Sequence, residues 1–148
     1  MSDCGRGFVA SAEVTIEAPI DEVWQALTDP AQIEQYMFGS QVVTDWEVGG
    51  EILWKGVWNG TPYQDHGVVL RCDPPRLLSY THFSPLSGQA DVAENHHTVV
   101  VGLSGDGEHT RVELTQDNNG SDEARQHSEA NWEVMFDGLK RLLEEEPG

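Results

Sequence analysis

The sequence has few cysteines, few basic residues and no long apolar run. Its two cysteines are Cys4, near the start, and Cys72, in a segment of alternating apolar residues. No disulfide framework is expected, and we predict a cytoplasmic protein. No apolar stretch approaches the roughly 18 residues that cross a bilayer, and no basic segment leads into an apolar one as in an export signal. These absences predict no membrane insertion.

Basic residues are the scarcer charged class. Eight Lys and Arg stand against 26 Asp and Glu, for a formal net charge of -18. This charge repels phosphate backbones and anionic membranes, so nucleic acid is not an expected partner. Two interpretations of the acidity stay open: solubility in a salty cytoplasm, and an acidic docking face for a basic partner. Arg outnumbers Lys six to two, which fits a GC-rich bacterial source.

The length of 148 residues suits one domain with one core. Residues 1–9 are small and polar and are predicted to form a flexible tail, followed by a single domain at residues 10–146. Alternating β-branched residues predict a strand at residues 12–18. Two short helices should follow it, the first capped by Asp21 and the second by Asp29.

Residues 41–116 alternate with period two and are interrupted by turn residues at close spacing. This pattern is typical of an antiparallel meander with one apolar face and one solvent-exposed face. The residues placed on the apolar face are Ile52, Trp54, Trp58, Val68, Leu70, Cys72, Leu78, Tyr80, His82, Val112 and Leu114.

Residues 121–145 return to the helical period after Ser121, a candidate cap. Their apolar stripe needs a partner, and the apolar face of the sheet is the large surface available. Gly138 costs about 1 kcal/mol relative to Ala in a helix interior. It indicates either close packing of the helix backbone against the sheet or a tolerated weakness. The fold class is therefore α+β, a helix-grip fold: a curved antiparallel sheet around a long C-terminal helix, with two short helices after the first strand.

Over residues 13–145 the sequence resembles a known family, the standalone domains similar to the activator of a heat-shock chaperone's ATPase. This family lies within the START-like or Bet v 1-like (SRPBCC) helix-grip superfamily. The segments that carry the resemblance are Ile16–Pro19, Val23–Pro30, Val48–Gly50, Gly67–Leu70, Pro74–Leu77, Gly107–Leu114, Trp132 and Leu139. The resemblance implies an internal cavity for a hydrophobic or aromatic small molecule.

Aromatic residues recur on the surfaces that should face this cavity. Aromatic walls with a few polar groups are typical of small-molecule sites, although plain core packing would use the same residues. The predicted ligand-binding residues are Trp54, Trp58, Tyr80, His82, Trp132, Met135 and Phe136.

Acid–base chemistry has three candidates in the sequence. His82 is predicted to face inward beside Tyr80, and His66 to face inward on the neighbouring strand. A hydrogen-bonded core histidine is the alternative interpretation. No Ser-His-Asp order, glycine-rich phosphate loop or Cys-x-x-Cys motif is present, so the sequence does not require an enzyme and predicts no cofactor.

A metal site is not predicted either. Glu94, His96 and His97 lie close together in the sequence. Successive strand residues point to opposite faces, so the two histidines cannot share one metal without a bulge.

Three functions follow as hypotheses. The leading one is non-catalytic binding of a hydrophobic or aromatic small molecule, such as a lipid or polyketide, in the sheet–helix cavity. The alternative is a polyketide cyclase-like, dehydratase-like or hydrolytic enzyme that uses His82, His66 and Tyr80. The family name suggests a third, stimulation of a chaperone ATPase in a stress response. The expected partner is an apolar small molecule, with a homodimer and a chaperone left open.

Overall fold

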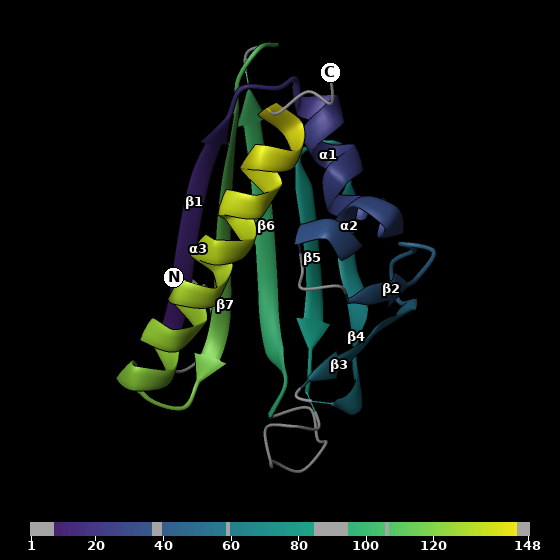
Figure 1. The fold of residues 1–148 in the computed structure, drawn as a ribbon, viewed down its shortest axis with the longest axis vertical. Helices are drawn as coiled ribbons and strands as arrows, with labels where there is room; N and C mark the ends of the chain where they lie inside the picture. Colours follow the sequence, from purple (N-terminus) through teal and green to yellow (C-terminus); the bar gives the residue numbers. More distant parts are fainter. Residues whose placement is uncertain (1–7, 37–39, 59, 85–94, 106, 145–148) are drawn as a thin grey trace.

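The computed structural model describes residues 8–36, 40–58, 60–84, 95–105 and 107–144, without the side chain of Trp58. Seven strands form one antiparallel sheet in the order β1-β7-β6-β5-β4-β3-β2. Figure 1 shows the long helix α3 lying across one face of this sheet, with α1 and α2 beside its C-terminal half. The elements are β1 (Phe8–Ile16), α1 (Ile20–Thr28), α2 (Pro30–Tyr36), β2 (Gln41–Val43), β3 (Glu51–Trp58), β4 (Thr61–Asp73), β5 (Leu77–His82), β6 (His97–Gly105), β7 (Thr110–Asn119) and α3 (Asp122–Glu144). The predicted helix-grip fold is confirmed.

The N-terminal strand begins earlier than the sequence suggested. Phe8 and Val9 were expected in the tail, but both belong to β1. Phe8 lies opposite Asn119, whose Nδ2 donates a hydrogen bond of 2.9 Å to the Phe8 carbonyl. The ten-residue β7 therefore supplies partners along the whole of β1. Glu94, which the sequence analysis considered and rejected as part of a metal site, lies outside the described residues.

Helix capping agrees with the sequence at α2 and differs at α1. Asp29 accepts hydrogen bonds from the Ala31 amide and the Gln32 side chain, each 3.1 Å long, which confirms its predicted role as the cap. The predicted cap Asp21 is wrong, because α1 begins at Ile20 and Pro19 occupies the cap position without a side-chain bond. Asp21 lies in the first turn of α1 instead, where its negative charge interacts favourably with the positive end of the helix dipole.

Strand β4 departs from the predicted alternation. Val69 is 1% exposed, whereas Val68 and Leu70 are each 40% exposed. The prediction that Val68 and Leu70 share the buried face with Cys72 is therefore wrong. A bulge between Val69 and Arg71 adds one residue on the β4 side of the ladder, and this shifts the alternation between the two parts of the strand.

The apolar stripe of α3 faces the sheet as predicted, with Trp132, Phe136 and Leu139 all buried. Gly138 marks a close contact, but with α2 rather than with the sheet. A Cβ atom at Gly138 would lie 3.2 Å from the Cβ of Tyr36. Within the described part of the chain, no helix has the length and apolarity needed to cross a membrane.

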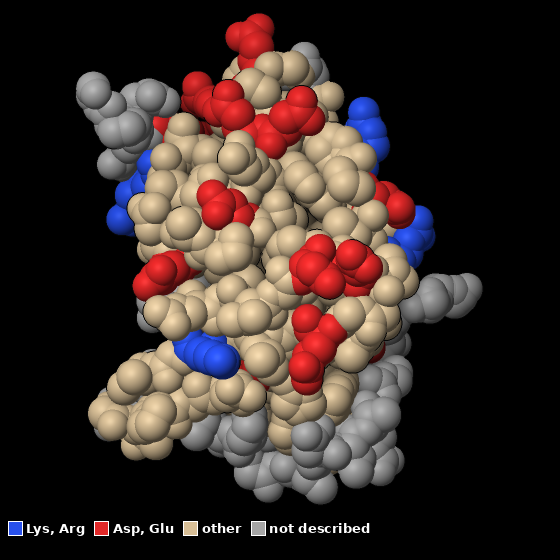
Figure 2. Space-filling model, turned by 90° about the vertical axis from the view of Figure 1, so that its right-hand side faces the viewer, with Lys and Arg blue, Asp and Glu red and all other residues tan. Residues whose placement is uncertain are grey.

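Acidic side chains are exposed at several places on the surface. Figure 2 shows the face to the right of Figure 1, where Asp and Glu lie in several separate groups with uncharged surface between them. On this face the acidic charge is not gathered into one patch.

Candidate functional site

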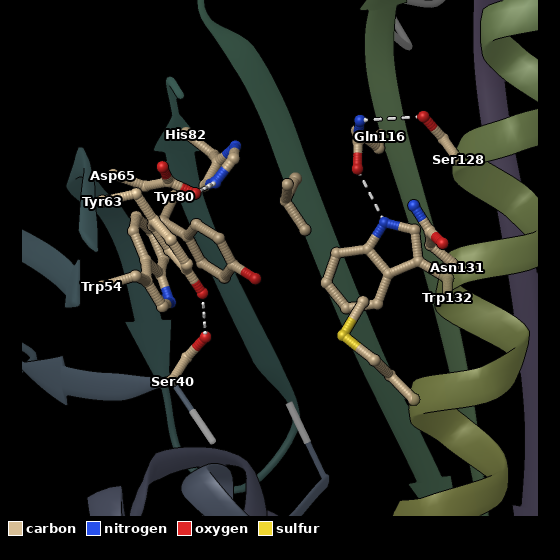
Figure 3. Close-up of a pocket in the computed structure, with 12 residues that line it drawn as sticks. Ser40, Trp54, Tyr63, Asp65, Tyr80, His82, Gln116, Ser128, Asn131 and Trp132 are labelled. Carbon is tan, nitrogen blue, oxygen red and sulfur yellow. Dashed lines mark hydrogen bonds and ion pairs between the residues drawn. The ribbon is translucent and has the colours of Figure 1, made fainter. Parts of the chain in front are cut away.

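A cleft of about 260 Å³ separates the sheet from the N-terminal half of α3 (Figure 3). Strands β3 to β7 and the residue before β2 form one side, and α3 forms the other. The lining residues are Ser40, Trp54, Tyr63, Asp65, Tyr80, His82, Val99, Gln116, Ser128, Asn131, Trp132 and Met135.

Aromatic rings form two opposite walls of the cleft. The ring centroids of Trp54 and Tyr80 are 5.5 Å apart on the sheet side, and Trp132 faces them from α3 (Figure 3). Burial raises the pKa of the Tyr80 phenol well above its ordinary value. Tyr80 therefore stays protonated at neutral pH and serves as an apolar wall with a hydroxyl group, not as a base.

The polar end of the sheet side is a histidine–carboxylate pair. The Nε2–H of His82 donates a hydrogen bond of 3.0 Å to Oδ2 of Asp65, and the side chains are 29% and 15% exposed. The ring of Trp54 meets the imidazole edge to face, with centroids 4.9 Å apart. The other carboxylate oxygen, Oδ1 of Asp65, is buried and has no hydrogen-bond partner in the described structure.

Hydrogen bonds hold the side chains on the α3 side. The indole Nε1–H of Trp132 donates to Oε1 of Gln116 at 2.6 Å. The amide nitrogen of Gln116 lies 3.4 Å from the Ser128 hydroxyl, which in turn donates to Oδ1 of Asn119 at 2.8 Å. This chain of bonds orients Trp132 and leaves its ring face toward the cleft.

His66 does not join His82 at the cleft. Asp65 lies opposite the inward Trp54 in the β3–β4 ladder, and His66 lies opposite Leu53. Alternation therefore places His66 on the other face of the sheet, where its ring lies 5.6 Å from that of Phe83. The prediction that His66 faces inward is wrong, because it assumed the wrong phase for β4.

The other predicted site residues divide into three groups. Trp54, Tyr80, His82, Trp132 and Met135 line the cleft. Phe136 lines a separate space of about 20 Å³ deeper in the core. Trp58 ends β3, and its side chain lies outside the described structure.

Sequence reasoning missed the polar lining of the cleft. Asp65 and Tyr63 precede the bulge in β4, so the wrong phase placed them outside. Gln116 ends the predicted meander and showed no pattern of its own. His97 and His96, considered for a metal, contact different rings: His97 stacks near His82 and His96 on Phe83. Among the described residues, no group of three His, Cys, Asp or Glu side chains could hold a metal ion.

Comparison with known proteins places this arrangement in a family. Residues 17–144 match the family model described as Activator of Hsp90 ATPase homolog 1-like protein. No curated protein matches the chain.

Solved structures show the same fold. A protein from Cytophaga hutchinsonii is 44% identical, with 96% of this chain and 97% of that chain covered and a TM-score of 0.83. CalU16 from Micromonospora echinospora is 26% identical, with 92% and 76% covered and a TM-score of 0.71. The Aha1 dimer from Colwellia psychrerythraea is 20% identical, with 96% and 100% covered and a TM-score of 0.72, and shows the fold alone. The resemblance predicted from the sequence is confirmed: this chain belongs to the family of Activator of Hsp90 ATPase homolog 1-like proteins.

Proposed function

We propose that this chain is a binding domain for a hydrophobic or aromatic small molecule, held in the cleft between the sheet and α3. The observation that carries the proposal is the cleft itself, which brings Trp54, Tyr80 and Trp132 to one space while leaving that space unfilled by side chains. Aromatic walls with a few convergent polar groups are the usual composition of small-molecule sites.

The size of the cleft limits the ligand. A volume of about 260 Å³ lies just below the range of roughly 300 to 1,000 Å³ that is common for ligand pockets. A molecule with one ring or two fused rings fits this space. Long acyl chains would need the cleft to open further.

Blocking the cleft from α3 tests the proposal. Asn131 lies on α3 at the cleft and is exposed, so Asn131→Phe should fill the space without disturbing the core. Val134→Phe is the matched control, because Val134 is 57% exposed on the same helix and does not line the cleft. Native mass spectrometry after incubation with naphthalene derivatives should show an adduct on the wild type and on Val134→Phe, and none on Asn131→Phe. Equal adducts on all three proteins would place the ligand elsewhere.

A second function is favoured by the histidine–carboxylate pair. Because Asp65 accepts the Nε2–H of His82, the other ring nitrogen is left as a proton acceptor, the arrangement of a general base. In this hypothesis His82 removes a proton from a carbon next to the ligand's carbonyl group. The measurement is deuterium incorporation at that carbon of 1-tetralone in D₂O. Exchange on His82→Asn as fast as on the wild type would rule this chemistry out.

A further inference from the structure

The carboxylate of Asp65 is incompletely paired. Oδ2 accepts the hydrogen bond from His82, while Oδ1 is buried and has no partner among the described residues. Leaving a buried polar atom unpaired costs free energy, on the order of 1 to 3 kcal/mol for a neutral group and more for a charged one. Because Asp65 lines the cleft, a bound molecule that carries an N–H or O–H donor would improve the pairing of this carboxylate.

The rest of the cleft is suited to a donor and unsuited to an anion. Its lining, which consists of described residues, contains one carboxylate and neither Lys nor Arg. The rings of Trp54 and Tyr80 lie beside the pair formed by His82 and Asp65 (Figure 3), and the faces of aromatic rings attract cations. The net charge of -18 adds a field of the same sign around the molecule.

We propose that the cleft selects small aromatic molecules by an N–H or O–H donor that bonds the carboxylate of Asp65, prefers a primary ammonium to a hydroxyl, and rejects carboxylates. This inference rests on the proposed function, since it names the chemical class of the molecule that the cleft binds. The aromatic walls hold the ring system, and Asp65 recognises its polar end. The ammonium group ranks first because its hydrogen bond to the carboxylate is charge-assisted and because the neighbouring rings favour it further.

Four compounds with one skeleton separate ring binding from donor recognition. They are 2-methylnaphthalene, 2-naphthalenemethanol, 2-(aminomethyl)naphthalene and 2-naphthoic acid, each titrated by calorimetry at physiological ionic strength. We expect the amine to bind at least about tenfold more tightly than the methyl compound, the alcohol to fall between them, and the acid to bind more weakly than all three. This order would support the proposal.

Asp65→Asn is the decisive variant because it keeps the shape of the side chain and removes its charge. The amine should lose about tenfold in affinity and the acid should lose none, while the methyl compound binds as before and shows that the cleft is folded. Glu51→Gln is the matched control, since Glu51 is exposed on β3 away from the cleft and its removal changes the net charge equally. His82→Asn should keep the preference for the amine, because it leaves the Asp65 side chain in place.

Two results would overturn the proposal in different ways. If all four compounds bind the wild type equally, or if Asp65→Asn leaves their order unchanged, the cleft binds aromatic molecules without donor recognition. The proposed function then stands and the inference falls. If none of the four compounds binds, both fall together.

Discussion

The two halves of α3 cover the same sheet but leave very different amounts of space. The C-terminal half packs against α1, α2 and the sheet, and the space beneath it is about 20 Å³. The N-terminal half borders a cleft of about 260 Å³. Figure 1 shows that α1 and α2 lie beside the C-terminal half of α3 only. The short helices therefore close one end of the sheet–helix interface and leave the other end open.

The side chains of α3 follow the same division. Phe136 and Leu139 in the closed half are 3% and 0% exposed, and Gly138 lets Tyr36 of α2 approach closely. In the open half, Ser128 and Asn131 turn polar groups toward the cleft. One amphipathic helix thus serves stability at one end and ligand contact at the other. Variants on this helix can test the division directly.

Truncation of a side chain in each half should give the largest contrast. Leu139→Ala removes a fully buried side chain and should lower the free energy of unfolding by about 3 kcal/mol. Met135→Ala, beside the cleft, should cost about 1 kcal/mol or less, because Met135 is only partly buried and already borders open space. Urea denaturation of both variants measures the two values. Equal losses would mean that the two halves do not differ in packing.

Adding volume should give the next largest effect. Gly138→Val places a branched side chain where a Cβ atom alone would lie 3.2 Å from Tyr36, so we expect a loss of about 2 kcal/mol from overpacking. Asn131→Val is the control in the open half, since it places the same branched side chain on the same helix beside the cleft, in place of one of similar size. It should change stability by less than about 1 kcal/mol. Thermal unfolding of both variants measures the difference, and a larger loss for Asn131→Val would contradict the division.

The closed half was easier to predict from the sequence than the open half. Leu139 and Leu142 recur at helical spacing, and this pattern predicted the buried face of α3 in the closed half. Asp65 gave no such signal, because its direction depends on the bulge between Val69 and Arg71, and a bulge is set by how β4 pairs with β5. The chain pattern thus determines which elements pack together, while the phase of one strand decides which polar group enters the cleft.

Removing one tyrosine hydroxyl beside each half of α3 should have a smaller effect on stability. The hydroxyl of Tyr36 is buried and donates to the Ala26 carbonyl at 3.0 Å, and burial raises its pKa well above the ordinary value. Tyr36→Phe should cost about 1 kcal/mol, because it leaves a buried carbonyl without its partner. The hydroxyl of Tyr63 bonds Ser40 at 2.8 Å beside the cleft, where water can replace it. Tyr63→Phe should cost less than half as much in urea denaturation.

The smallest expected effect on stability concerns the C-terminal end of α3, at the edge of the closed half. Glu144 accepts hydrogen bonds from Lys140 at 2.6 Å and from the Glu17 amide at 2.9 Å, and these partners lower the pKa of Glu144 below its ordinary value of 4.5. A lowered pKa in the folded state means that the carboxylate stabilises the fold above about pH 4.5 and that this contribution disappears as the pH falls through the folded-state pKa. Glu144→Gln should therefore cost less than about 1 kcal/mol at pH 7.

The cost of the same variant should shrink as the pH falls through the folded-state pKa of Glu144, and urea denaturation at pH 7 and at one pH below that titration measures the change. Glu133→Gln is the control, because Glu133 is exposed on α3 and should have little effect at either pH. A loss for Glu144→Gln that persists at the lower pH would mean that the side chain acts through its shape and not its charge. The edge of the closed half would then depend on packing in the same way as its centre.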